Sequence, residues 1–280
     1  VGAAKAGTTS LHRYLAASPD IFMSETKEPH FFSTVDPRGT WSIVGDQEEY
    51  LALFADRQSA KYAGESSPSY LWDPETPDRI AASSPAARII MVLRDPGKRA
   101  HSHFLMDVRE GRNEGSFLDA IQRDYELEEK GWGVSHLYVE LGLYADAIER
   151  FHRVFGKQNV AVLIFEEFVQ HPSETLAEIA TFLDLPSDTF ASANTSTTHN
   201  PYREPRVKWL RRLFSSGVPA VMRKWVPKTL RQLARSATLR KSAPPTMDEV
   251  AKSYLHKLFE ADIRRVEKIL GRTLPWDRSS

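Results

Sequence analysis

The sequence predicts an α/β fold in which a central parallel sheet is flanked by helices on both faces. Short apolar runs rich in β-branched residues alternate with helix-like patterns along the chain, which is typical of a parallel sheet. The two clearest runs, residues 89–93 and 160–165, are continuously apolar, as strands covered on both faces usually are. A glycine-rich turn near the start leads from a strand into a helix. We expect one domain, with an α/β core over residues 1–200 and a helical C-terminal portion over residues 200–280 packed on it as a lid.

The first third of the chain holds the glycine-rich turn and two long links. Residues 1–5 carry neither an initiator Met nor a signal pattern, so we interpret them as the end of a strand whose earlier residues precede this sequence. Prolines punctuate residues 18–40 and 64–77, which predicts loops there. Between these links, Asp46 precedes a helical pattern over residues 48–54 and is suited to cap it.

Two capping pairs mark helices in the remainder of the chain. Ser116, with Asp119 three positions later, marks the start of one helix. Thr246, with Glu249, marks the start of a long amphipathic helix that should end at Gly271.

Composition limits the classes of protein to consider. The chain of 280 residues is 41% hydrophobic, and its 37 basic and 37 acidic side chains cancel, so overall charge gives no indication of a nucleic-acid partner. No cysteine is present, which excludes disulfides, a thiolate nucleophile and cysteine-bound metals. The longest apolar runs are far shorter than the roughly 20 residues of a membrane-spanning helix. We expect a cytoplasmic protein, and the oligomeric state is left open.

Positive charge is concentrated in one segment. Residues 203–241 hold twelve basic residues against one acid, Glu204, a net charge of about +11 that the rest of the chain balances. Apolar residues recur through this basic segment at helix-like spacing. One interpretation is a pair of solvated amphipathic helices. The other is a cap that brings positive charge to an anionic ligand, or to a membrane surface that the protein contacts peripherally.

The glycine-rich turn over residues 2–11 has the form of a phosphate or sulfate site, because N–H groups at a helix N-terminus bind anions. Lys5 adds a full charge, and Gly7 allows the backbone to approach an anion closely. Three hydroxyls follow, on Thr8, Thr9 and Ser10. The alternative is a plain strand-to-helix turn capped by threonine or serine.

The turn departs from that of nucleotide hydrolases, whose lysine directly follows the second glycine. Here Lys5 precedes Gly7 by two positions, which argues against an ATPase or GTPase. Asp95 resembles the acid that holds Mg²⁺ in such enzymes, although Pro96 after it indicates a helix start. Two alternative functions are retained: a metal-dependent phosphotransferase that uses Asp95, and a basic membrane or nucleic-acid binding module on a degenerate nucleotide fold.

Four short blocks are similar, in this order, to the sulfotransferase superfamily. They are Lys5–Ser10, Lys27–Phe32, Glu65–Tyr70, and Leu93–Pro96 with Ser102 eight residues after Arg94. The chain most resembles the branch that includes the heparan sulfate sulfotransferases and their bacterial relatives. The resemblance implies a P-loop-like fold, transfer of a sulfuryl group from 3′-phosphoadenosine 5′-phosphosulfate (PAPS) to a hydroxyl or amine, and 3′-phosphoadenosine 5′-phosphate (PAP) as product. It implies no metal.

The resemblance also implies which residues bind the donor. In the family the first block binds the 5′-phosphosulfate, and the matching residues here are Lys5, Ala6, Gly7, Thr8, Thr9 and Ser10. Lys5 would stabilise the charge that develops on the leaving oxygen. Arg94 and Ser102 would hold the 3′-phosphate. Arg203 or Arg206, in the basic segment, would reach the nucleotide from the C-terminal side.

Glu28 stands where heparan-type members carry their general base. His30 is the competing base, since other branches use histidine, and the alternative for His30 is a packed, hydrogen-bonded residue. Lys27 either orients the sulfuryl oxygens or is a solvated loop residue. Ser66 replaces a lysine that is common after the glutamate of the third block, which weakens the expectation of a glycosaminoglycan acceptor. A carbohydrate, a lipid and a small molecule are therefore all retained as acceptors.

Overall fold

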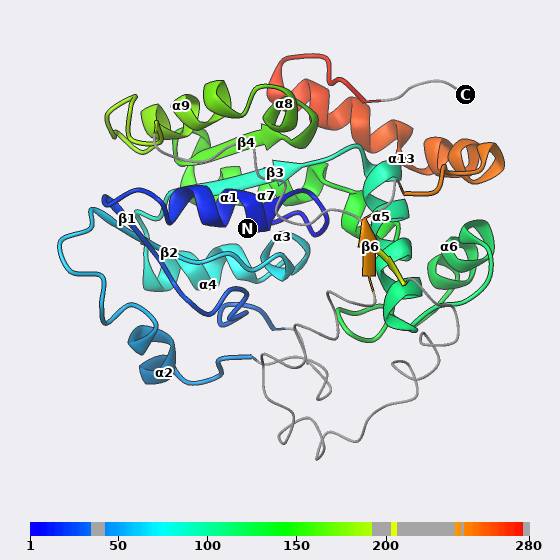
Figure 1. The fold of residues 1–280 in the computed structure, drawn as a ribbon, viewed down its shortest axis with the longest axis horizontal. Coiled ribbons are helices and arrows are strands. Elements are labelled where there is room, and N and C mark those ends of the chain that lie inside the picture. Colours follow the sequence, from blue (N-terminus) through cyan, green and yellow to red (C-terminus); the bar gives the residue numbers. More distant parts are fainter. Residues whose placement is uncertain (35–42, 192–202, 206–238, 242–243, 277–280) are drawn as a thin grey trace.

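A pair of parallel strands lies at the centre of the computed structural model (Figure 1). β3 (Ile89–Leu93) and β4 (Val160–Ile164) run side by side, with Ile89 opposite Val160 and Leu93 opposite Ile164. Parallel strands of this kind confirm the predicted α/β class. The structure describes residues 1–34, 43–191, 203–205, 239–241 and 244–276.

Residues 1–3 lie along the other edge of β3. The Ala3 N–H donates to the Val92 carbonyl at 2.7 Å, and the Val92 N–H donates to the Gly2 carbonyl at 2.9 Å. Because the N–H and C=O of one strand residue point to the same side, these bonds use the edge of β3 that faces away from β4. The start of the chain therefore extends the sheet and places the glycine-rich turn at the carboxyl end of β3.

The prediction of loops over residues 18–40 and 64–77 is wrong in part. The first contains β1 (Ile21–Met23), which pairs in parallel with β2 (Tyr62–Gly64). The second contains α3 (Ser69–Trp72) and the start of α4 (Thr76–Ser83). The prolines do not break these helices, because Pro68 and Pro77 stand at helix starts, where a missing N–H loses no hydrogen bond within the helix.

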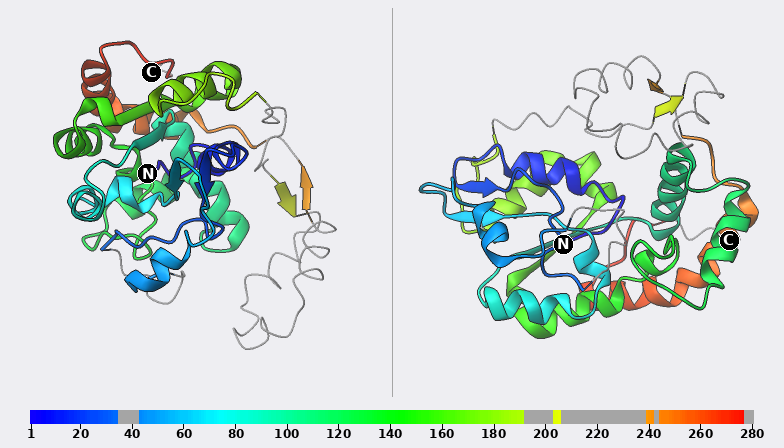
Figure 2. Two further views of the ribbon diagram at one scale, coloured as in Figure 1. Left: turned by 90° about the vertical axis from the view of Figure 1, so that its left-hand side faces the viewer. Right: turned by 90° about the horizontal axis from the view of Figure 1, so that it is seen from below.

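The remaining helices surround the strands. They are α1 (Thr8–Leu15), α2 (Gln47–Ala52), α5 (Pro96–Glu110), α6 (Phe117–Tyr125), α7 (Ala145–Phe155), α8 (Phe165–Gln170), α9 (Pro172–Phe182) and α13 (Glu249–Leu270), with short 3-10 turns η1 (Glu140–Gly142) and η2 (Lys157–Asn159). Figure 2 (right) shows α1 on one side of the strands and α4, α7 and α13 on the other. Phe165 begins α8 instead of extending β4.

Two of the three predicted helix caps are present. Asp46 accepts from the N–H of Glu48 at 2.8 Å, and Ser116 accepts from that of Asp119 at 3.2 Å. The third is wrong, because Asp248 rather than Thr246 caps the long helix by accepting from the Val250 N–H at 2.8 Å. A carboxylate beside the first turn also interacts favourably with the helix dipole.

The C-terminal helix α13 is built into the same core as the central strands. Its inward side chains Leu255, Phe259 and Val266 are at most 1% exposed and belong to the buried cluster that includes β3. The two ends of the basic segment, β5 (Arg203–Pro205) and β6 (Leu239–Lys241), pair as antiparallel strands where helices were expected. The rest of that segment lies outside the described residues. Within the described part of the chain, no helix combines the length and apolarity needed to cross a bilayer.

Candidate active site

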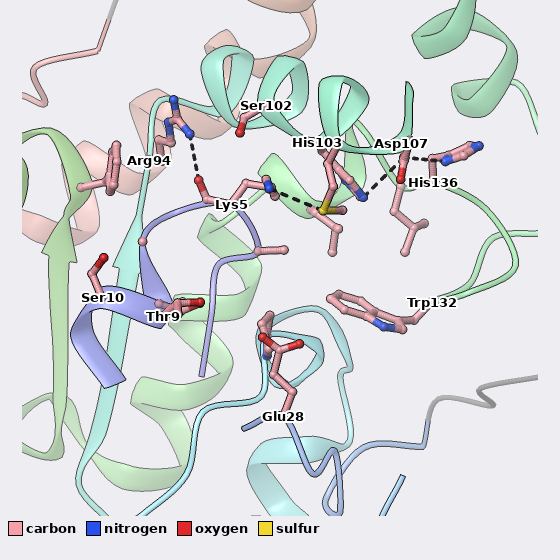
Figure 3. A pocket seen from close by; sticks show the side chains of 18 of the residues that line it. Lys5, Thr9, Ser10, Glu28, Arg94, Ser102, His103, Asp107, Trp132 and His136 are labelled. Carbon is pink, nitrogen blue, oxygen red and sulfur yellow. Dashed lines mark hydrogen bonds and ion pairs between the residues drawn. The ribbon is translucent and has the colours of Figure 1, made fainter. Parts of the chain in front are cut away.

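A cavity of about 1010 Å³ opens where the glycine-rich turn, the middle and C-terminal part of α5 and the loop over residues 131–137 meet (Figure 3). It lies at the carboxyl end of β3, the usual place for ligands in open α/β sheets. Most of the site residues expected from the sequence line it: Lys5, Gly7, Thr8, Thr9, Ser10, Glu28, Arg94 and Ser102. Of the expected residues in the basic segment, Arg206 lies outside the described residues, and only the backbone of Arg203 is described.

The turn before α1 is shaped to present N–H groups. Gly7 precedes the helix with φ of 82°, and Lys5 also has a positive φ, 69°. A helix leaves its first N–H groups without partners inside the helix, and the first turn of α1 carries no acidic side chain. The positive end of the helix dipole therefore faces the cavity, where it favours an anion.

Only glycine fits at position 7. A Cβ there would lie 2.9 Å from two ring carbons of Phe165, and φ is in the left-handed region. We expect Gly7→Ala to lower the free energy of unfolding by about 1–3 kcal/mol, as measured by urea denaturation. The matched control is Gly271→Ala, because Gly271 has a similar φ of 68° with open space around it. Equal losses in the two variants would show that the contact with Phe165 costs nothing.

Lys5 is a partly buried cation. Its Nζ lies 3.5 Å from Sδ of Met106 on α5, so the lysine reaches across the cavity wall to that helix. Burial lowers the pKa of Lys5 to about 8, and the like charge of Arg109 contributes to the shift. An anion bound beside Lys5 would restore part of the lost solvation and favour the charged form.

Arg94 is held by three contacts. Nη1 donates to the Lys5 carbonyl at 2.9 Å, and the guanidinium lies 4.8 Å from the centre of the Phe165 ring. The Tyr144 hydroxyl donates to the Arg94 carbonyl at 2.9 Å. Among the described residues the buried Nε has no hydrogen-bond partner, and an unpaired buried donor is costly. Arg94 thus fits an anionic ligand, with the Ser102 hydroxyl on the same cavity.

Glu28 lies on the wall opposite Lys5 (Figure 3). Its side chain is 37% exposed and forms an ion pair with Lys27, the neighbouring residue. The backbone φ of Glu28 is 67°, an uncommon value for a residue with a side chain. A carboxylate that is solvated from the cavity and held by one cation can accept a proton from a bound molecule.

Two residues expected at the site do not line the cavity. His30 is 3% exposed, with Nδ1 2.6 Å from the Ser69 hydroxyl and its N–H donating to the Ser67 hydroxyl at 3.0 Å. Burial lowers the pKa of His30, which keeps the ring neutral at physiological pH. Ala6 is fully buried, and its N–H donates to the Ala3 carbonyl within the turn. The structure thus places both in packing positions.

Sequence reasoning missed one wall of the cavity. His103 and Asp107 on α5 line it together with Trp132 and His136 from the loop over residues 131–137. The spacing of four between His103 and Asp107 on a helix was the one available signal, since it places them on one face. The loop residues belong to no motif.

Asp95 acts as a helix cap. Its carboxylate accepts from the Lys98 N–H at 2.8 Å and so caps α5. It is 6% exposed. In the described ranges, no group of three or more His, Asp or Glu side chains is placed to hold a metal ion.

Comparison with known proteins decides the family. The family described as "Sulfotransferase family" matches residues 22–189, more than half of the chain. The chain belongs to the sulfotransferase family. Human heparan sulfate glucosamine 3-O-sulfotransferase 6 is 29% identical over 187 residues, which cover 66% of this chain and 51% of that protein. Human carbohydrate sulfotransferase 15 is 26% identical over 240 residues, with 66% of this chain and 43% of that protein covered. The chain spans about half the length of the curated relatives it matches.

Solved structures support the same assignment. A sulfotransferase from Alicyclobacillus acidocaldarius matches with a TM-score of 0.73 and 27% identity, and covers 98% of this chain and 95% of its own. Mouse sulfotransferase SULT7A1, solved in complex with PAP, matches with a TM-score of 0.52 at 16% identity, over 95% of this chain and 84% of its own. The second likeness concerns the fold alone. The predicted family resemblance and the sulfotransferase fold are both confirmed.

Proposed function

We propose that this sulfotransferase moves a sulfuryl group from PAPS to a hydroxyl or amine of a carbohydrate, lipid or small-molecule acceptor. The observation that carries the proposal is that two groups suited to binding anions line one cavity. One is the N-terminus of α1 with Lys5. The other is Arg94, whose Nε has no hydrogen-bond partner within the described ranges and which lies near Ser102 (Figure 3). A nucleotide with phosphate groups at both its 3′ and 5′ positions has two matching anions.

The two anion positions are joined by a direct contact. Arg94 donates to the carbonyl of Lys5, so the residue proposed for the 3′-phosphate also supports the turn proposed for the 5′-phosphosulfate. The Phe165 ring packs against the Arg94 guanidinium and lies close to Gly7, so it supports both residues. Such a prearranged site costs little to organise when the donor binds.

The proposed reaction is an in-line transfer. An oxygen or nitrogen atom of the acceptor forms a bond to sulfur while the bond from sulfur to the oxygen of the 5′-phosphate breaks, and the acceptor proton passes to the Glu28 carboxylate. Attack and departure occur on opposite sides of sulfur, and Lys5 and Glu28 lie on opposite walls of the cavity (Figure 3). Lys5 would stabilise the negative charge on the leaving oxygen.

For the acceptor, the relatives support a general class of compound. The printed names of the relatives concern heparan sulfate glucosamine and carbohydrate, which favours a carbohydrate among the proposed acceptors. Ser66, at the position where heparan-type members carry a lysine, lies 3.0 Å from Nδ1 of His12 on α1. Because serine carries no charge, this position offers no cationic contact to the acceptor. Of the alternative functions, the metal-dependent phosphotransferase loses support because Asp95 caps α5.

The donor site is tested by thermal unfolding in the presence of nucleotides. We expect PAP to raise Tm clearly more than AMP or ATP at equal concentration, because only PAP supplies both anions to the native state. Arg94→Lys should reduce the PAP shift to that of AMP, since lysine keeps the charge but loses the Nε donor and the planar contact with Phe165.

The matched control is Arg88→Lys, because Arg88 also lies over a phenylalanine ring, that of Phe182, but does not line this cavity. The PAP shift should be unchanged in that variant. Equal stabilisation of the wild-type protein by AMP and PAP would show that no 3′-phosphate position exists.

A further inference from the structure

One wall of the cavity carries a histidine that is held by a buried carboxylate. Asp107 on α5 is 1% exposed, and its Oδ2 accepts hydrogen bonds from Nδ1 of His136 and from the Tyr138 hydroxyl, both at 2.8 Å. Because a carboxylate only accepts, the proton of this bond is on Nδ1 of His136. The imidazole also stacks on the Tyr138 ring, with centroids 4.9 Å apart and planes within 3°.

The backbone of the same histidine is held by a second buried aspartate. Asp124 on α6 is 3% exposed and accepts from the His136 N–H at 2.6 Å and from the Tyr138 N–H at 3.0 Å. Two desolvated carboxylates from two helices thus fix one loop residue in position and orientation. Burying carboxylates is expensive, and the transfer step proposed above uses neither of them.

The charged groups around His136 favour its protonated form. The hydrogen bond from His136 to Asp107 raises the pKa of the imidazole, and Asp124 adds to the effect. Arg112, which lies 3.7 Å from Asp107, acts in the opposite direction. His103, also 3.7 Å from Asp107, stays neutral because burial lowers its pKa to about 3.

His136 lies on the far side of Lys5 from Arg94 and Ser102, the residues proposed to bind PAPS. In Figure 3, Arg94 and Ser102 lie at one end of the row along α5, Lys5 lies near the middle, and Asp107 and His136 lie at the other end. The His136 side chain is 31% exposed and lines the cavity. A molecule that approaches sulfur at Lys5 from the side away from the donor would therefore meet this imidazole.

We propose that His136 binds the sulfuryl acceptor by donating a hydrogen bond from Nε2 to an acceptor oxygen, and that Asp107 is the residue that positions it. The inference rests on the proposed function, because it takes the Arg94 side of Lys5 as the donor side. Nδ1 is engaged by Asp107, so Nε2 is the nitrogen that remains for the acceptor. When His136 loses its second proton, Nε2 ceases to be a donor, and acceptor binding weakens while the transfer step is unaffected.

The test is the pH dependence of acceptor KM. The acceptor is the compound that is turned over fastest in a panel of alkyl, phenyl and glycosyl alcohols with ³⁵S-labelled PAPS. For the wild-type protein, acceptor KM should rise as pH increases through the pKa of His136, with kcat nearly constant. His136→Gln should raise acceptor KM at low pH by about 10- to 100-fold, the worth of one charge-assisted hydrogen bond, and should remove this pH dependence.

Two further variants separate positioning from folding. Asp107→Asn should move the midpoint of the KM profile to lower pH, because the carboxylate that favours the imidazolium is gone. His152→Gln on α7, whose side chain does not line the cavity, should keep the wild-type profile. The stabilisation by PAP reports folding and donor binding in every variant, and it should be retained in all three.

The failures of the two proposals can be told apart. An unchanged acceptor KM profile in His136→Gln, with normal PAP stabilisation and turnover, overturns the role of His136 and leaves the proposed function intact. A loss of kcat without a change in KM overturns it as well. Absence of PAP stabilisation and of turnover with every alcohol in the wild-type protein overturns the proposed function, and this inference with it.

Discussion

Lys5→Ala is expected to lower kcat by about 10²–10³-fold while PAPS binding weakens much less. The ammonium group interacts most strongly with charge that appears only as the bond from sulfur to the leaving oxygen breaks, so its loss raises the barrier more than it weakens ground-state binding. Single-turnover rates with labelled PAPS measure the first effect, and calorimetric titration with PAPS in the absence of acceptor measures the second. A loss confined to donor affinity would contradict the assigned role.

The pKa of Lys5 provides a second readout of the same group. Burial lowers it to about 8, so in the free enzyme Lys5 is charged below pH 8 and neutral above it. The value of kcat/KM for the donor reports groups of the free enzyme, and it should therefore fall as pH rises through about 8. Lys5→Arg is the matched control, because its guanidinium stays charged and should remove that decline whatever its absolute rate.

Glu28→Gln is expected to lower kcat by about 10²–10⁴-fold, the usual contribution of general base catalysis. Glutamine has nearly the same shape as glutamate but cannot accept the acceptor proton. It also breaks the ion pair with Lys27, so stabilisation by PAP must be measured alongside turnover and should be nearly unchanged. The rate is measured with labelled PAPS and the best alcohol from the panel.

The control for this prediction is His30→Gln, which changes the other residue considered as the base. His30 is buried and hydrogen-bonded to Ser69, so its replacement should lower Tm and leave the turnover of the folded protein close to that of wild type. Near-normal turnover in Glu28→Gln together with a large loss in His30→Gln would reverse the assignment of the base.

The sequence determined those features of this protein that depend on neighbouring residues. Continuous apolar runs marked β3 and β4, because a strand covered on both faces needs apolar side chains at every position. The turn with Lys5 and Gly7 was evident because glycine and lysine in that order have a local conformational and electrostatic meaning. The order of the four blocks identified the family, which the match over residues 22–189 confirmed.

Tertiary structure decided how side chains from separate segments are used. Glu28 and His30 are two positions apart in one block, yet one lines the cavity and the other packs against Ser69 and Ser67, which follow β2. The bond between Asp107 and His136 joins residues 29 positions apart, and the contact of Lys5 with Met106 joins residues 101 apart. Such contacts depend on how helices and loops pack on the sheet. A local pattern records which groups a segment offers, but only packing decides which of them share a cavity and which are buried.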